Sequence, residues 1–599
     1  MSSVDIQQIL KDTFGHSEFR FHQESIVNTI LEGKDVLGVM PTGAGKSICY
    51  QVPALYLDGV TLVVSPLISL MQDQVVQLHE NGIKACFLNS NLNLKEKEKH
   101  KASIMRGDVK IVYVSPEGLL SNSLLSFFLK VNIALIAIDE AHCVSQWGHE
   151  FRKDYTRLGE LRQHFPSIPF MALTATADSR TRDDIVNQLH FKSHEVFISS
   201  FDRPNIRYNI HERLNEIKQL DSFIKESYQG DTGIVYCLSR KKVEKVTESL
   251  KKLGHKAMAY HAGLSPEVRR EAQISFDQDE GVIIVATIAF GMGINKPDVR
   301  FVAHLDLPKS IEGYYQETGR AGRDGEKAQA WMVYGLQDVM KLSQMLETTD
   351  ANESYKKNAR LKLDAMLSLC ETLDCRRDFL LSYFEEKIPK PCGNCDTCLN
   401  PAETFDASID AQKVLSTIYR TGQVYGAGYI IDVLRGSLSS KVLERGHDKL
   451  TVHGIGKDKP LNHWNFIIRH LLNGGYLRIK NWEYRNFGLT EKSGEILKGE
   501  VSYHLRKKSL SASENKNTSR KVDPSLSEAQ NSLFQELKAL RKSLAQEGNV
   551  PAYIIFPDKS LLDMCHLMPR NKEEFLLVNG VGVSKCERYA QAFMQVING

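Results

Sequence analysis

Short apolar runs alternate with longer amphipathic segments over the N-terminal half of the chain. The apolar runs predict strands at residues 36–39, 61–65, 111–115, 134–139 and 170–174, and then, from about residue 206, at 233–237, 257–260, 282–286 and 301–304. Buried strands that alternate with helices are typical of a parallel sheet covered by helices on both faces. The pattern therefore predicts two successive α/β lobes, each built on a parallel sheet.

A glycine-rich turn follows the first predicted strand and reads Met40-Pro-Thr-Gly-Ala-Gly-Lys-Ser47. Such a turn directs backbone N–H groups toward an anion at the start of the next helix. Lys46 can reach the β- and γ-phosphates of a nucleotide, and Ser47 can offer its hydroxyl to Mg²⁺. Upstream, Arg20 and Gln23 suit adenine, although an ordinary surface helix has the same residues. The predicted nucleotide contacts are Arg20, Gln23, Thr42, Gly43, Gly45, Lys46 and Ser47.

Two further motifs carry the groups that hydrolysis would need. The strand at 134–139 ends in an acidic pair, in which Asp139 can hold Mg²⁺ and Glu140 can polarise the attacking water. The second lobe lacks a phosphate loop but contains Arg320 and Arg323. We expect Arg323 to act as an arginine finger, worth ~10³–10⁵ in rate when engaged, with Arg320 as a second contact. A protein in which hydrolysis requires both lobes to close is expected to work as a motor.

Four of the eleven cysteines form a cluster with the spacing C-x₁₆-C-x₂-C-x₂-C. Its members are Cys375, Cys392, Cys395 and Cys398. Four thiolates without an open position describe a structural Zn²⁺ site, and an iron–sulfur cluster is the alternative metal group. The other seven cysteines are scattered, so we expect them to be buried as small apolar residues.

The region from 405 to 505 predicts helices followed by a two-stranded wing, with its main helix at 460–473 and strands at 476–479 and 486–490. Lys and Arg outnumber Asp and Glu here, whereas the whole chain carries a net charge of only +3. A local basic patch fits nucleic acid, although a solvated face has the same composition. The wing also contains two aromatic residues, Trp482 and Tyr484.

Other candidate DNA contacts lie in a loop after the acidic pair and in the C-terminal region. The loop offers Gln146, Trp147, His149, Phe151 and Arg152. Aromatic and basic side chains in such a loop suit stacking on single-stranded bases, with simple packing as the alternative. Residues 506–525 are polar and predict a flexible linker. After them comes a small helical unit, whose glycine-rich turn can meet DNA phosphates or serve packing alone.

Together these motifs resemble the RecQ DNA helicases of superfamily 2. The resemblance is carried by residues 41–47 (PTGAGKS), 139–142 (DEAH), 174–176 (TAT) and 316–323 (QETGRAGR), and by the runs 65–74, 146–151 and 289–296. It covers nearly the whole chain in the bacterial order of modules. It implies ATP-driven translocation from 3′ to 5′ on single-stranded DNA and unwinding of duplexes in recombination, replication, repair and the SOS response. It also implies that the loop at 145–152 couples single-strand binding to hydrolysis. By the same resemblance, Trp482 and Tyr484 in the wing are candidates for separating DNA strands, unless their rings pack inward, and Tyr553 and Lys559 are candidate single-strand contacts in the C-terminal unit.

The expected fold is therefore α/β, with two RecA-like parallel-sheet lobes (1–205 and 206–345), a zinc-binding helical module (346–404), a winged-helix domain (405–505), the linker (506–525) and an all-α HRDC-type domain (526–599). ATP, Mg²⁺ and structural Zn²⁺ are the expected cofactors. The expected partners are single-stranded and forked duplex DNA, single-stranded-DNA-binding protein and other repair factors. Without an apolar run of ~18 residues or an N-terminal signal, we expect a location in the bacterial cytoplasm and no membrane contact. The expected oligomeric state is a monomer.

Two other classes of function compete with this interpretation. An RNA helicase or a duplex translocase could use the same motor, but the zinc, winged-helix and tail combination argues against both. A non-enzymatic DNA-binding or strand-annealing scaffold would not need the intact set of Lys46, Asp139, Glu140 and Arg323.

Overall fold

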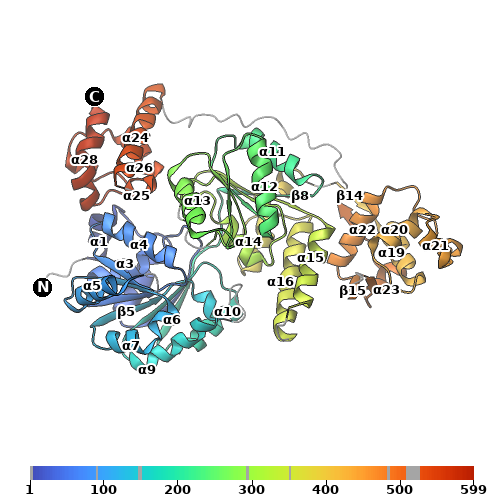
Figure 1. Ribbon diagram of the computed structural model, residues 1–599, viewed down its shortest axis with the longest axis horizontal. Helices are drawn as coiled ribbons and strands as arrows, with labels where there is room; N and C mark the ends of the chain where they lie inside the picture. The colour runs from blue at the N-terminus through green and yellow to red at the C-terminus, as the bar shows by residue number, and fades with distance from the viewer. Residues whose placement is uncertain are drawn as a thin grey trace.

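The structure is a computed structural model (Figure 1). It describes all residues except 1–4, 90–91, 146–151, 292–293, 295, 350–352, 402, 482–485, 507–526, 549 and 599. Two α/β lobes form the body of the molecule. The C-terminal helices lie beside the first lobe, and the winged-helix domain lies at the opposite end (Figure 1).

The first lobe is built on a seven-stranded sheet in the order β3-β4-β2-β5-β6-β1-β7. All neighbouring strands pair in parallel. The strands are β1 (Asp35–Val39), β2 (Val60–Val64), β3 (Ala85–Leu88), β4 (Ile111–Val114), β5 (Ile133–Ile138), β6 (Phe170–Thr174) and β7 (His194–Ile198). The five predicted strands are confirmed. The two edge strands, β3 and β7, were not predicted; β3 is short, and the side chains of β7 are mostly exposed.

Helices cover both faces of this sheet because alternate strand residues point to opposite sides. One face packs on α1 (Ile6–Phe14), α2 (Gln23–Leu31), α3 (Ile48–Tyr56) and α4 (Ile68–Glu80). The other packs on α5 (Leu94–Met105), α6 (Pro116–Leu119), α7 (Asn122–Phe128), η1 (Ala141–Val144), α8 (Lys153–Thr156), η2 (Arg157–Glu160), α9 (Leu161–His164) and α10 (Ser179–Gln188). The carboxyl ends of β5, β6 and β1 lie side by side in this sheet, at the edge where parallel sheets bind ligands.

The second lobe has a six-stranded parallel sheet in the order β10-β11-β9-β12-β13-β8. Its strands are β8 (Ile206–Glu212), β9 (Gly233–Tyr236), β10 (Ala257–Tyr260), β11 (Ile283–Ala286), β12 (Phe301–His304) and β13 (Ala328–Tyr334). Its helices are α11 (Glu216–Ser227), α12 (Arg240–Lys252), α13 (Pro266–Gln278) and α14 (Ile311–Thr318). The four predicted strands are confirmed, whereas β8 and β13 were not predicted. Gly233 allows β9 to approach β12, since a Cβ there would lie 2.0 Å from the Phe301 ring.

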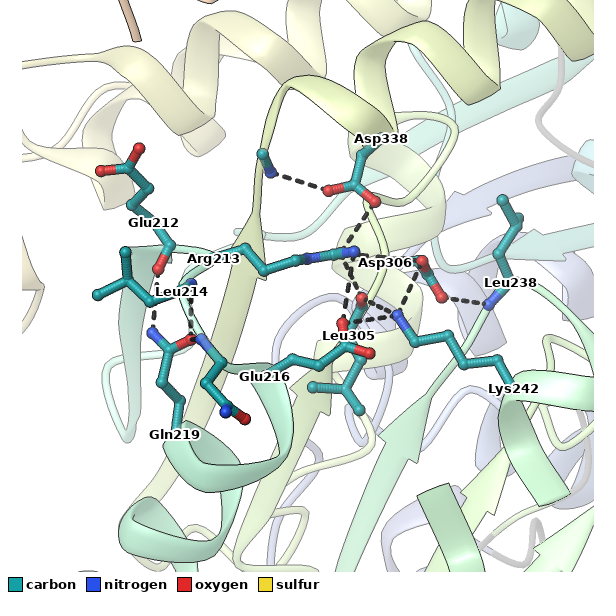
Figure 2. A network of polar contacts seen from close by, with 12 residues as sticks. Glu212, Arg213, Leu214, Glu216, Gln219, Leu238, Lys242, Leu305, Asp306 and Asp338 are labelled. Carbon is teal, nitrogen blue, oxygen red and sulfur yellow. Dashed lines mark hydrogen bonds and ion pairs between the residues drawn. The ribbon is translucent and has the colours of Figure 1, made fainter. Parts of the chain in front are cut away.

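Charged side chains tie together the carboxyl ends of several strands in this second sheet (Figure 2). Arg213, after β8, pairs with Asp338 at 2.9 Å, and Lys242 pairs with Asp306 at 3.0 Å and with Glu216 at 2.8 Å. These ion pairs are largely buried, so each partner would be costly to leave alone. The network joins the ends of β8 and β12 to the helices that follow β8, β9 and β13, and so stiffens this end of the sheet.

A helical module and a winged-helix domain follow the second lobe. The module contains α15 (Leu336–Glu347), α16 (Glu353–Glu371), α17 (Arg376–Tyr383) and α18 (Asp396–Leu399). The winged-helix domain contains β14 (Thr404–Asp406), α19 (Ser408–Arg420), α20 (Ala427–Arg435), α21 (Ser440–Glu444), η3 (His447–Lys449), α22 (Leu461–Asn473), β15 (Leu477–Asn481), β16 (Asn486–Leu489), α23 (Ser493–Leu497) and β17 (His504–Arg506). The predicted main helix and both wing strands are confirmed. Glu371 of α16 joins the two parts through Arg469 (3.1 Å) and His470 (2.9 Å) of α22.

The C-terminal domain is helical, as predicted, and docks on the first lobe. It contains α24 (Glu528–Glu547), α25 (Ala552–Ile555), α26 (Asp558–Leu567), α27 (Lys572–Phe575) and α28 (Val583–Asn598). The Gly580 N–H donates to the carbonyl oxygen of Gly15 at 2.8 Å. Arg588 and Tyr589 bind the Glu80 carboxylate of α4 at 3.0 and 2.8 Å. A contact between Lys538 and Glu280 (2.8 Å) reaches the second lobe, so this domain spans both lobes.

Candidate nucleotide site and metal centre

A cavity of about 450 Å³ is lined by both lobes and by the C-terminal domain. The first lobe contributes Thr42, Gly43, Gly45, Lys46, Ser47, Asp139 and Glu140, and the second contributes Gln316, Arg320 and Arg323. Every predicted catalytic residue and most predicted nucleotide contacts therefore meet at one place. Gln23 and Arg20 do not line the cavity directly.

The glycine-rich turn between β1 and α3 is shaped by backbone that favours glycine. Gly43 and Gly45 have φ values of 88° and 75°, in the left-handed region. A Cβ at Gly45 would lie 2.7 Å from Nε2 of Gln23. That amide donates to the carbonyl oxygens of Ala44 and Gly45 at 3.0 Å each. Gln23 thus supports the turn from behind, and its predicted contact with adenine stays a prediction.

The acidic pair lies directly after β5 at the floor of the cavity. Burial, reinforced by Glu140, raises the pKa of Asp139 to about 7, although Lys46 opposes the shift. Glu140 adopts a left-handed backbone (φ 50°), and its Oε2 lies 3.3 Å from Nδ1 of His142. That Oε2 is buried and accepts no hydrogen bond from the part of the chain that the structure describes. It is therefore available to a water molecule beside the phosphates.

His142 links the acidic pair to β6 within the first lobe. Its Nδ1 lies 2.9 Å from the hydroxyl of Thr174 at the end of that strand. Burial, with the nearby Lys46 and Arg152, lowers the pKa of His142 to about 3, so the ring is neutral at neutral pH. A neutral imidazole can hold its position between the two groups without adding charge to the cavity.

Basic side chains from both lobes surround the same space. Burial lowers the pKa of Lys46, against the attraction of Glu140 and Asp139. Burial, with Arg320 and Arg203 nearby, lowers the pKa of Arg323 to about 9. A Cβ added to Gly43 would lie only 3.6 Å from Cγ of Arg323. The Arg323 side chain therefore faces the glycine-rich turn from the second lobe. Desolvated cations crowded together in this way favour a polyanionic ligand.

The C-terminal domain supplies a third wall that the sequence did not reveal. Tyr553 and Lys585 line the cavity, and Lys585 Nζ donates to the carbonyl oxygen of Ile554 at 2.7 Å. Burial lowers the pKa of Lys585 to about 8. No local motif marks Lys585, because only docking brings α28 to the cavity. Tyr553 was predicted to contact DNA, and that role, like the one for the exposed Lys559, stays a prediction.

The four clustered cysteines form a compact site. Their sulfurs all lie within 4.8 Å of one another. Cys375 and Cys395 precede α17 and α18, and backbone N–H groups of Asp378 and Asn394 point at Cys375 and Cys392 at 3.4 Å. Burial opposes ionisation of Cys395, but hydrogen bonds from Thr397 and the backbone N–H of Cys398 lower its pKa to about 7. Four sulfur donors this close together, with backbone N–H groups directed at two of them, suit a thiolate-bound metal.

Comparison with known proteins identifies the family to which the chain belongs. The chain is 47% identical to the ATP-dependent DNA helicase RecQ of Haemophilus influenzae over 98% of this chain and 95% of that one. The corresponding RecQ proteins of Pasteurella multocida and Bacillus subtilis are 46% and 37% identical, over 100% and 99% of this chain and 95% and 98% of theirs. The chain belongs to the RecQ family of ATP-dependent DNA helicases.

Five family models match successive parts of this RecQ chain. They are the DEAD/DEAH box helicase (20–185), the helicase conserved C-terminal domain (215–325), RecQ zinc-binding (336–399), the RQC domain (401–514) and the HRDC domain (530–597). The predicted fold and family are therefore confirmed, with ATP and zinc as cofactors. The zinc-binding model covers all four cysteines and supports zinc over the iron–sulfur alternative.

Most of the predicted DNA contacts fall in segments outside those that the structure describes. Gln146, Trp147, His149, Phe151, Trp482 and Tyr484 lie outside the described residues, as does the predicted linker apart from residue 506. Arg152 is described, and its guanidinium donates to the carbonyl oxygen of Pro66 at 3.0 Å. Among the helices that the structure describes, none is both long and apolar enough to span a membrane.

Proposed function

We propose that this RecQ helicase hydrolyses ATP in the cavity between its lobes and uses lobe closure to move 3′ to 5′ along single-stranded DNA, unwinding duplexes as it goes. The convergence of Lys46, Asp139 and Glu140 with Arg320 and Arg323 carries the proposal. The phosphate loop and the arginine pair lie on different lobes. Because hydrolysis needs both, each turnover requires the lobes to close.

Each side chain of the site then has a defined task. Lys46 and the N–H groups of the glycine-rich turn hold the phosphates, while Arg323, supported by Arg320, neutralises charge that develops on the γ-phosphate. Glu140 orients the attacking water through its buried Oε2, while the neutral ring of His142, 3.3 Å from that oxygen, closes the space behind it. Ser47 and Asp139 would hold Mg²⁺, which when bound supplies positive charge to the phosphates.

The zinc site has a structural task in this proposal. All four donors come from the protein, so no position is left for a reacting water. The metal would lock the ends of α17 and α18 together. Arg376 of α17 reinforces this junction by pairing with Asp396 of α18 at 2.6 Å.

The remaining modules would handle DNA. We assign single-strand contacts to Gln146, Trp147, His149, Phe151 and Arg152, strand separation to Trp482 and Tyr484, and accessory contacts to Tyr553 and Lys559. Family membership supports 3′-to-5′ polarity, action in recombination, replication and repair with single-stranded-DNA-binding protein and other repair factors, a cytoplasmic location and a monomeric state. The predicted domain boundaries belong to the same proposal.

The decisive experiment compares duplexes with a 3′ tail, a 5′ tail or a fork, each incubated with ATP or with a non-hydrolysable analogue. We expect unwinding of the 3′-tailed and forked duplexes with ATP only, and stronger stimulation of ATPase by DNA than by RNA. Unwinding of the 5′-tailed duplex alone would overturn the polarity. RNA-selective stimulation would instead favour an RNA helicase.

A further inference from the structure

Arg203 lies in the short segment that connects the two lobes, between the end of β7 and the start of β8. Its guanidinium donates to carbonyl oxygens of both lobes. One terminal nitrogen, Nη1, donates to Thr42 at 2.9 Å and to Gly319 at 3.1 Å. The other, Nη2, donates to Ala321 and Gly322 at 2.9 Å each. All four terminal N–H groups are thus used within one planar fork.

These acceptors belong to the two loops that the proposed reaction must bring together. Thr42 is part of the phosphate loop, whereas Gly319, Ala321 and Gly322 flank Arg320 and precede Arg323. The loops touch at this point, since a Cβ at Gly319 would lie 3.4 Å from the Thr42 Cβ. One side chain therefore joins the loop that holds the phosphates to the loop that carries the arginine pair.

The connecting segment around Arg203 is itself fixed. Glu386 of the zinc-binding module accepts from the Phe201 N–H at 2.7 Å, and Arg377 of that module forms a two-pronged ion pair with Asp202. On the other side, Asn205 donates to the carbonyl oxygens of Gly322 and Glu326 at 2.8 Å each. With its neighbours held in this way, Arg203 has little freedom to adopt another position.

On the basis of the function proposed above, we propose that Arg203 is a positioning residue. It holds the phosphate loop and the arginine loop in the correct relative position when the lobes close. Three of its four hydrogen bonds go to the second lobe and one goes to the first. When the lobes separate, the bond to Thr42 is the one that breaks, and Arg203 stays with the arginine loop. Arg203 thereby acts on hydrolysis through Arg320 and Arg323 without touching the nucleotide.

The test is steady-state DNA-stimulated ATPase of the full chain carrying Arg203→Ala. A misplacement of about 1 Å at the reacting groups costs up to ~100-fold in rate. We expect kcat to fall by about 10- to 100-fold while KM for ATP changes by less than about twofold, because the first lobe holds the phosphates by itself. Arg203→Lys should recover part of the loss, since a lysine keeps the charge but cannot span four carbonyl groups.

A double variant separates positioning from general damage. If Arg203 acts through Arg323, the Arg203→Ala/Arg323→Ala chain should be no slower than Arg323→Ala alone. The matched control is Arg182→Ala, which removes another interdomain arginine, paired with Glu385 at 2.7 Å, that belongs to neither loop. It should keep wild-type kcat.

Two results would overturn the role of Arg203. One is an unchanged kcat in Arg203→Ala, and the other is a loss in the double variant that multiplies the two single losses. If Arg203→Ala fails to fold, as judged by thermal unfolding, the same comparison is made with Arg203→Lys. A wild-type chain without DNA-stimulated ATPase would instead refute the proposed function.

Discussion

A single methyl group should release the C-terminal domain from the first lobe. At the seam between them, a Cβ added to Gly582 would lie 2.4 Å from the carbonyl oxygen of Thr13 and 2.8 Å from that of Asp12. Both are backbone atoms, so neither can rotate away. Gly582 lies outside the left-handed region, and alanine is therefore compatible with its own backbone. Gly582→Ala should leave the domain folded and disturb only its docking.

The loss of docking free energy can be worked out from the contact distances at this seam. Relief of the clash requires the seam to open by about 1 Å, which lengthens the 2.8 Å bond from the Gly580 N–H to Gly15 beyond hydrogen-bonding distance. A neutral hydrogen bond contributes about 1 kcal/mol, and the partly exposed contacts of Arg588 and Tyr589 with Glu80 add a similar amount. The expected loss is about 2 kcal/mol, or ~30-fold in the docking equilibrium.

Amide hydrogen exchange of the full chain measures this opening directly. Exchange at the Gly580 amide should accelerate by ~30-fold, while amides inside α24 and α28 keep their protection because the domain stays folded. Gly428→Ala is the control, since nothing lies within 4 Å of a Cβ at that position. Unchanged exchange at Gly580 would show that the seam does not hold the domain.

Three further outcomes can be checked separately. Lys46→Ala should abolish ATP hydrolysis and unwinding yet retain DNA binding in a filter or anisotropy assay; retained unwinding would refute the motor. Cys395→Ser, or removal of zinc with a chelator, should lower the melting temperature and not merely slow turnover, since the metal holds α17 to α18. Burial opposes ionisation of Glu371, but His470 and Arg469 lower its pKa to about 2. Because that pKa is depressed, its stabilisation is complete above about pH 4.5 and disappears as the pH falls toward 2, a difference on the order of 3 kcal/mol. Acid unfolding of Glu371→Gln should therefore be shallower over this window than that of the wild type, and identical curves would contradict the assignment.

The central strands and the chemical motifs could be read from the sequence because local patterns encode them. Strands buried on both faces appear as continuous apolar runs, which is why β1, β2, β4, β5 and β6 were predicted. Edge strands such as β7 expose most of their side chains and carry no such pattern. The spacing of the cysteines does not mark the helix boundary beside them, where α16 ends at Glu371 and Cys375 caps the separate helix α17.

By itself, the sequence determined which groups perform chemistry: Lys46 in its glycine-rich turn, the acidic pair at Asp139, and four cysteines at metal-binding spacing. Each of these signals is local, because backbone geometry or ligand spacing constrains neighbouring residues. The tertiary structure alone decided that Arg203 bridges the two loops and that Lys585 faces the nucleotide cavity. Both roles depend on segments far apart in the chain meeting in space. The residues next to Arg203 and Lys585 in the sequence carry no pattern that depends on these distant contacts. The contacts therefore could not be predicted from the sequence.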